Sequence, residues 1–115
     1  MDATTEHATI VDELETLLAA LSGATPPALA ELEETLTSGY AHALALEAER
    51  LRLERRIGTL AAGLGEAPQS RAQELVTLAQ RLASADGDLD RLRALLAPLR
   101  LRVSALRAEA AAAPA

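Results

Sequence analysis

The chain has 115 residues, of which half are hydrophobic, and it carries 17 acidic and 11 basic residues for a net charge of −6. This length is that of about one domain, and the acidic balance argues against nucleic acid as a partner, because phosphate binding needs a basic surface. No cysteine is present, which excludes disulfide bonds and thiolate chemistry.

The apolar residues are mostly strong helix formers. Leucine occurs 23 times and alanine 27 times, against one tyrosine and no phenylalanine or tryptophan. This composition predicts an all-α fold with an aliphatic core, and the scarcity of β-branched residues argues against a sheet. The polar, acidic first residues lack the pattern of a signal peptide, and no run of about 18 apolar residues is present. We therefore expect a cytoplasmic protein without a membrane span.

The first predicted helix covers residues 5–21. Its apolar side chains recur at helical spacing and form one stripe, made of Ile10, Val11, Leu14, Leu17, Leu18 and Leu21. Gly23 suits the left-handed position that closes many helices. Thr25 then offers an N-cap, with Pro26 at the first position of the next helix.

The second predicted helix covers residues 26–64 and carries a heptad seam. Apolar or small side chains alternate at steps of three and four residues from Leu29 onward across five heptads, which is typical of a coiled coil. Three positions in the seam are not large and apolar: Gly39, Ala43 and Arg50. Gly63 and Gly65 predict the end of this helix and the start of a loop.

The third predicted helix covers residues 71–110. Ser70 and Gln73 fit a capping box at its start. From Leu75 to Leu106 the seam again steps by three and four without a slip, straight through residues 86–88. One long helix therefore fits best, with Gly87 on its outer face, and the alternative is two collinear helices that break at residues 86–88. Pro98 lies off the seam and should kink the helix.

The two seams can be docked as an antiparallel hairpin in which the numbers of facing residues add up to 135. Leucines then face large apolar residues along most of the seam, while Gly39 faces Leu96 and Ala43 faces Leu92. This match of large with small residues fits the constant packing density of protein cores. We predict an elongated antiparallel hairpin with the shorter first helix as its third member, in a single domain of residues 1–115.

Arg50 is a charged residue within a seam of leucines. It either extends its aliphatic stem toward water or pairs with an acidic residue and sets the register. The predicted docking places Arg50 opposite Ala85 and beside Asp86, so we favour an ion pair between Arg50 and Asp86.

Residues with catalytic or metal-binding potential are few. The only histidines are His7, which we expect in solvent, and His42, which we expect to pack or lie on the surface. Neither stands in a helical metal-binding pair, and the acidic residues at 86, 88 and 90 lack the glycine and glutamate positions of a calcium loop. No phosphate-binding glycine loop occurs. We therefore expect no enzyme activity, no metal and no cofactor.

Apolar residues outside the seams indicate a protein partner. They are Tyr40, Leu44, Leu51, Val76, Leu95 and Leu101. The first helix is too short to cover all of them, and exposed apolar surface commonly marks an interaction site. Because Pro98 weakens its helix and arginines border the apolar positions, we predict that a partner binds the C-terminal half of the last helix, through Leu95, Leu99, Leu101, Val103 and Leu106.

The order of these parts resembles the FlgN-type flagellar export chaperones. The resemblance lies in the leucine-rich residues 14–21, the Leu-Ala-Leu-Glu-Ala-Glu-Arg-Leu-Arg-Leu-Glu-Arg-Arg-Ile run at 44–57, a Gly/Pro loop, and the leucine run at 89–96. It implies a non-enzymatic chaperone that binds hook–filament junction proteins before their export. Two alternatives remain open: a homo-oligomeric coiled-coil scaffold, and a helical adaptor or regulatory module. The chain would act as a monomer or a homodimer.

The seams lead to a prediction about shape. Residues 29–64 as one helix would be about 54 Å long, whereas a compact chain of this length has a radius of gyration of about 13 Å. Small-angle X-ray scattering should therefore give a radius well above the compact value, and circular dichroism should show a mainly helical chain. A compact globule would contradict the hairpin.

Overall fold

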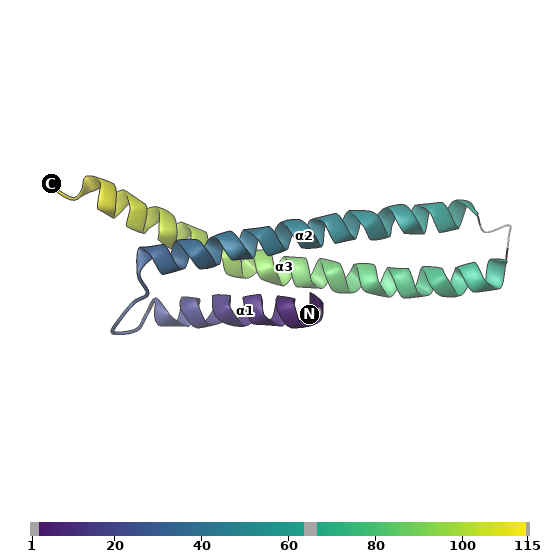
Figure 1. The fold of residues 1–115 in the computed structure, drawn as a ribbon, viewed down its shortest axis with the longest axis horizontal. Coiled ribbons are helices and arrows are strands. Elements are labelled where there is room, and N and C mark those ends of the chain that lie inside the picture. Colours follow the sequence, from purple (N-terminus) through teal and green to yellow (C-terminus); the bar gives the residue numbers. More distant parts are fainter. Residues whose placement is uncertain (1–2, 64–66, 115) are drawn as a thin grey trace. The chain divides into compact units, whose positions relative to one another are not determined.

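The computed structural model describes residues 3–63 and 67–114, and this part of the chain forms three helices without any strand (Figure 1). Helix α1 spans Ala3–Ala20, α2 spans Leu29–Ala62 and α3 spans Pro68–Ala112. The chain is thus an all-α hairpin bundle, as its composition predicts. None of these helices, within the described residues, is apolar over a length that would cross a membrane.

Helix α2 begins three residues later than the sequence suggested. The expected start at Pro26, capped by Thr25, is wrong, because the helix begins at Leu29 and its first turn closes with Leu32 N–H donating to Ala28 O at 3.1 Å. The cause is the second proline, Pro27. A steric clash disfavours the helical region for a residue that precedes proline, so Pro26 is a poor first helical residue.

Helix α3 begins earlier than predicted. Ser70 and Gln73 do not form a capping box at its start, since the helix begins at Pro68 and Arg71 N–H donates to Ala67 O at 3.1 Å. Proline suits a first helical position because the N–H group it lacks would have no partner there. Ala67, just before it, has a positive φ of 46°. The predicted end of the preceding helix at residue 64, and Gly65, lie outside the described residues.

The end of α1 is closed without the left-handed glycine that we predicted. Gly23 does not have a positive φ, and its N–H donates instead to Ala20 O at 3.0 Å. Leu21 N–H donates to Leu17 O at 3.1 Å, which continues the helical pattern by one residue. The carbonyl groups at the end of α1 thus accept hydrogen bonds from the residues that follow directly, in place of those that a left-handed cap would supply.

Helix α3 runs without a break for 45 residues. It passes through Gly87, which is exposed, so the uninterrupted heptad pattern was the better guide than the turn-like Asp-Gly-Asp sequence. It also passes through Pro98, which lies inside the helix and is exposed. Pro98 cannot donate a backbone hydrogen bond, so α3 has one such bond fewer at this point.

The chain forms two compact units, and α2 and α3 contribute to both. Unit 1 comprises residues 1–43 and 91–115, and unit 2 comprises residues 44–90. In unit 1, α1 packs with parts of α2 and α3 around a buried aliphatic core. The buried residues of this core are Val11, Leu14, Leu17, Leu32, Leu36, Ala43, Leu92, Leu96, Leu99 and Val103. The prediction of a single domain stays a prediction.

The core of unit 2 is a simple two-helix seam. One buried cluster consists of Leu53, Leu60, Leu78 and Ala85, with Ile57, Leu75 and Leu82 packed against it half-buried, and Leu89 of this unit is buried as well. Every one of these residues belongs to the heptad positions identified in the sequence. Interhelical ion pairs such as Arg56–Glu74 at 3.0 Å and Arg81–Glu49 at 3.1 Å flank the seam, with the residue number on one helix falling as the other rises. The hairpin is therefore antiparallel.

Gly39 occupies the predicted place opposite Leu96. A Cβ atom added at Gly39 would lie 2.5 Å from Leu96 Cδ2 and 3.7 Å from Leu14 Cδ1. Leu96 is 2% exposed and Leu14 is fully buried, so all three helices meet where this side chain is missing. The glycine makes room for a leucine from α3.

This arrangement predicts opposite effects of alanine at two helical glycines. Gly39→Ala should lose about 1 kcal/mol of stability, because overpacking costs about 1–3 kcal/mol and the gain in helix propensity is only about 1 kcal/mol. Gly87→Ala should gain about 0.5–1 kcal/mol, because nothing lies within 4 Å of an added Cβ there. Urea unfolding of both variants measures the difference.

Gly58→Ala provides a second open-space control, since an added Cβ at Gly58 also meets nothing within 4 Å. If Gly39→Ala stabilises the protein as much as Gly58→Ala and Gly87→Ala do, the tight contact between α2 and Leu96 is not a feature of the protein in solution.

Candidate functional site

The predicted partner-binding residues on α3 differ strongly in exposure. Leu99 and Val103 are 0% and 1% exposed and belong to the core of unit 1. Leu95 and Leu106 are half-buried, and Leu101 is 67% exposed. Leu99 and Val103 can therefore bind a partner only if this part of α3 separates from its neighbours, whereas Leu101 is accessible as the helix stands.

Leu101 lies at the centre of an exposed apolar face that the sequence reading missed. Residues three, four and seven positions apart share a face of a helix. At five of the six positions with these spacings from Leu101 stand small apolar residues, all of them exposed: Ala94, Ala97, Pro98, Ala105 and Ala108; the sixth is the exposed Ser104. We call the five apolar residues, with Leu101, the Leu101 face. The prediction from the sequence considered only large apolar side chains. The same helical spacing applied to the alanines would have identified the Leu101 face.

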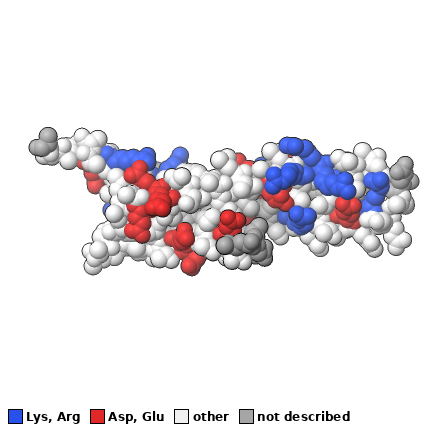
Figure 2. All heavy atoms as spheres, in the orientation of Figure 1, with Lys and Arg blue, Asp and Glu red and all other residues white. Residues whose placement is uncertain are grey.

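Arginines border the Leu101 face. Arg93, Arg100 and Arg102 are exposed and lie about 80–100° around the helix from Leu101, on its two sides. On the side of the molecule shown in Figure 2, basic atoms gather along the C-terminal part of α3, next to a group of acidic atoms. An apolar centre with a charged rim is the usual layout of a protein-binding surface.

Two ion pairs anchor this part of α3 within unit 1. Arg91 Nη2 lies 3.0 Å from Glu15 Oε1 of α1. Arg107 donates to Glu33 of α2 through two nitrogens, with Nε at 3.0 Å and Nη2 at 2.5 Å from the same oxygen. The side chains of both pairs are more than a third exposed, so each pair should contribute at most about 1 kcal/mol. They position α3 but leave the Leu101 face open.

Four other apolar residues outside the seams are also exposed. Tyr40 and Leu51 are 40% and 47% exposed, and Val76 and Leu44 are 58% and 66% exposed. The first helix therefore leaves most of the apolar residues outside the seams uncovered. Leu44 matches Leu101 in residue type and in exposure, which makes it a useful comparison.

The ion pair expected at Arg50 is present. Arg50 Nη1 lies 3.7 Å from Asp86 Oδ1, and Arg50 Nε lies 3.6 Å from Glu54 Oε1 on the same helix. About a third of the Arg50 side chain and half of the Asp86 side chain are exposed, yet Arg50 Nε and Asp86 Oδ1 are themselves shielded and have no hydrogen-bond partner within the described residues. Arg50 thus both reaches the surface and approaches an acid, and its role in setting the register stays a prediction.

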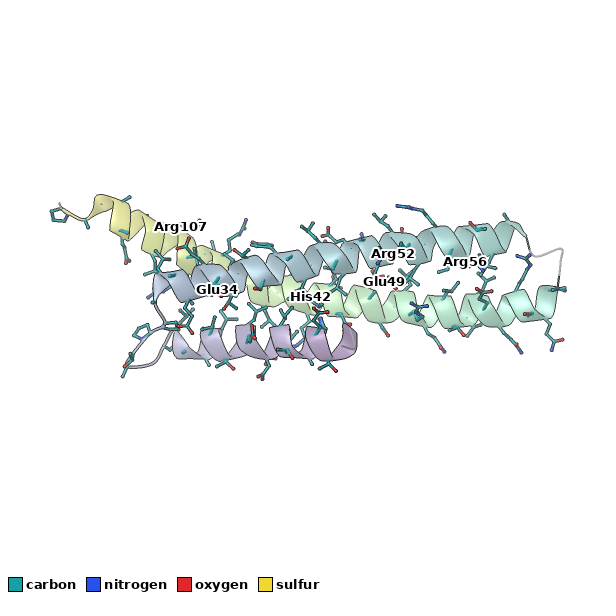
Figure 3. The ribbon with its side chains drawn as sticks, viewed as in Figure 1. Glu34, His42, Glu49, Arg52, Arg56 and Arg107 are labelled. Atoms are coloured by element: carbon teal, nitrogen blue, oxygen red, sulfur yellow. The ribbon has the colours of Figure 1, made fainter. Side chains whose placement is uncertain are left out.

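The two histidines meet, which the sequence did not indicate. His7 Nδ1 lies 2.9 Å from His42 Nε2, with ring centroids 5.1 Å apart, and both side chains are half-buried. The expectation that His7 is solvated is therefore wrong. His42, labelled in Figure 3, lies between α2 and α1. The reason is the docking of α1 alongside α2, which brings positions 35 residues apart together.

Comparison of the chain with models of protein families, with curated proteins and with solved structures found no match.

The geometry at Arg50 predicts that Arg50→Leu is neutral or stabilises the protein by up to about 1 kcal/mol. The exposed, long ion pairs contribute little, and a leucine would extend the apolar seam beside Ala85, which is buried. Since a polar residue in a seam specifies register and oligomeric state, the variant should also form more oligomer. Urea unfolding and light scattering measure the two effects.

Asp86→Ala is the matched control, because it leaves Arg50 with Glu54 as its acidic neighbour. It should change stability by less than about 0.5 kcal/mol. A loss above about 2 kcal/mol in Arg50→Leu would mean that the charge itself holds the hairpin together.

Proposed function

We propose that the chain is a non-enzymatic, protein-binding helical chaperone whose client docks on the C-terminal half of α3. The observation that carries this proposal is the Leu101 face, where a leucine that is 67% exposed stands among small apolar residues and is bordered by arginines. A surface of this kind suits helix-in-groove recognition, in which a partner helix inserts its apolar side chains between the charged borders.

The chemistry of the face also favours a kind of client. Alanine side chains are short, so a partner helix can approach the α3 backbone closely and gain dispersion contacts over its length. The arginines on both sides favour acidic residues flanking the client's apolar stripe. We therefore propose an amphipathic helix with an acidic border as the bound element.

The FlgN-type resemblance suggests which proteins contain that helix. In that family the clients are hook–filament junction proteins, which are bound before export, and we propose the same clients for this chain. The support is the order of the parts in the sequence and the all-α hairpin bundle that they form.

The test is the double variant Leu95→Ser with Leu101→Ser, assayed by pull-down of hook–filament junction proteins. We expect binding to be abolished while helicity stays nearly unchanged. Because Leu95 is half-buried, the single variant Leu101→Ser is the cleaner test of the surface. Burial of one leucine contributes about 1.5–3 kcal/mol, so Leu101→Ser alone should weaken binding about tenfold or more.

Leu44→Ser is the matched control, since Leu44 is 66% exposed and Leu101 is 67% exposed. Wild-type affinity in Leu101→Ser together with weakened binding in Leu44→Ser would move the client to the α2 surface around Tyr40 and Leu44. Wild-type affinity in both variants would refute a client site centred on either leucine.

A homo-oligomeric scaffold is distinguished by a different measurement. Light scattering over a concentration series reports whether the chain forms a stable dimer by itself. A monomer that captures a hook–filament junction protein supports the chaperone, whereas a stable dimer without a client supports the scaffold.

A further inference from the structure

The chain has only two histidines, and the fold brings them into direct contact. His7 comes from α1 and His42 from α2, and their nitrogens lie 2.9 Å apart. At this distance one ring nitrogen donates a proton and the other accepts it. The contact therefore requires that at least one of the two rings is neutral at the shared position.

Adding protons changes this contact in two distinct steps. A first proton leaves one charged and one neutral ring, and a hydrogen bond with a charged donor is stronger than a neutral one. A second proton removes the acceptor and places two cationic rings with centroids 5.1 Å apart. The hydrogen bond is then lost, and the two positively charged rings repel each other. Histidine is the side chain whose charge most readily changes near neutral pH, so pH is the variable with which to test this contact.

The start of α1 depends on this contact more than the rest of the helix does. Among residues 5–9, His7 has the one side chain that is not exposed. From Ile10 onward the helix is held by apolar packing, with Val11, Leu14 and Leu17 buried. Loss of the histidine contact would thus free the first two turns of α1 and leave the remainder docked. A segment in which most of the described side chains are exposed opens at a low free-energy cost.

Charged groups of both signs stand on the elements around the histidine pair. Among the described residues, the charged residues of α1 nearest to His7 in sequence are Glu6 and Asp12, both exposed, and the titratable residue of α2 nearest to His42 in sequence is Tyr40. On α3 the antiparallel register places Arg93 level with His42, with Asp90 and Arg91 within one turn of it. The elements packed around the histidine pair therefore carry both carboxylates and arginines, so the test has to separate their effects from those of the two rings.

We propose that His7 and His42 form a proton-sensitive latch. The latch holds the first two turns of α1 on α2 while at least one ring is neutral, and it releases them when both rings are protonated. Its stabilising effect is present at neutral pH and is lost as the pH falls. The proposal does not depend on the identity of the client.

The experiment is amide hydrogen exchange on the full chain, corrected for the intrinsic rate at each pH, with EDTA present to exclude metal ions. The amides of His7, Ala8 and Thr9 report on the latch, and those of Leu14 and Leu17 report on the rest of α1. From about pH 7.5 to about pH 5, we expect protection of the first group to fall about tenfold or more, and that of the second to stay constant.

Two variants test whether the pH dependence comes from the two imidazole rings. His42→Gln and His7→Gln each keep an amide that can hydrogen-bond the remaining histidine but cannot take up a proton in this range. In both variants, protection of the reporter amides should change less than about twofold between the two pH values. The imidazole NMR signals of the wild-type protein should show that protection is lost as the second ring becomes protonated.

Three results would overturn the latch. The first is constant protection in the wild-type protein across this range. The second is an equal fall in both glutamine variants, which would assign the effect to carboxylates such as Glu6 and Asp12. The third is loss of protection while one of the two rings is still neutral.

Discussion

The fold depends on a single constraint, the register in which α2 and α3 share their seam. Protein cores pack to a nearly constant density, so each large side chain in one helix needs a space in the other. Gly39 provides that space for Leu96 in unit 1, and in unit 2 the small Ala85 is buried in the seam near Arg50. Because a heptad seam looks alike every seven residues, these unequal positions distinguish the observed register from its shifted alternatives. The ion pairs between the two helices, Arg50–Asp86, Arg56–Glu74 and Arg81–Glu49, follow from this register.

The seam could be predicted from the sequence because its signal is repeated. The 3,4 spacing recurs over several heptads in both long helices, and each repeat adds independent support for helix type, continuity and pairing. The repeated pattern therefore outweighed the turn-like signal of Gly87 and correctly predicted that α3 is one helix. The contact between Gly39 and Leu96 could be predicted for the same reason, since it depends only on the register and on residue size.

The remaining features depend on local sterics or on packing without a repeat. The predicted start of α2 was wrong because Pro27 restricts the backbone of Pro26. The predicted end of α1 was wrong because a glycine permits a left-handed cap without requiring it. Contact between His7 and His42 depends on how far α1 slides along α2, and the short stripe of α1 does not fix that offset. The Leu101 face was not predicted because its alanines were treated only as helix-forming residues, and their contribution to an exposed apolar surface was not considered.

The two compact units differ in how they are encoded along the chain. Unit 2 is one continuous stretch, residues 44–90, whereas unit 1 joins residues 1–43 to residues 91–115. The first 49 residues contain ten acidic residues and no arginine or lysine, and the arginines that pair with Glu15 and Glu33 are Arg91 and Arg107. During synthesis, which runs from the N-terminus, α1 therefore emerges well before the residues that complete its core and neutralise its charge. Residues 44–90 of unit 2 are contiguous and can pack together before residues 91–115 are made, whereas α1 can complete its core only afterwards.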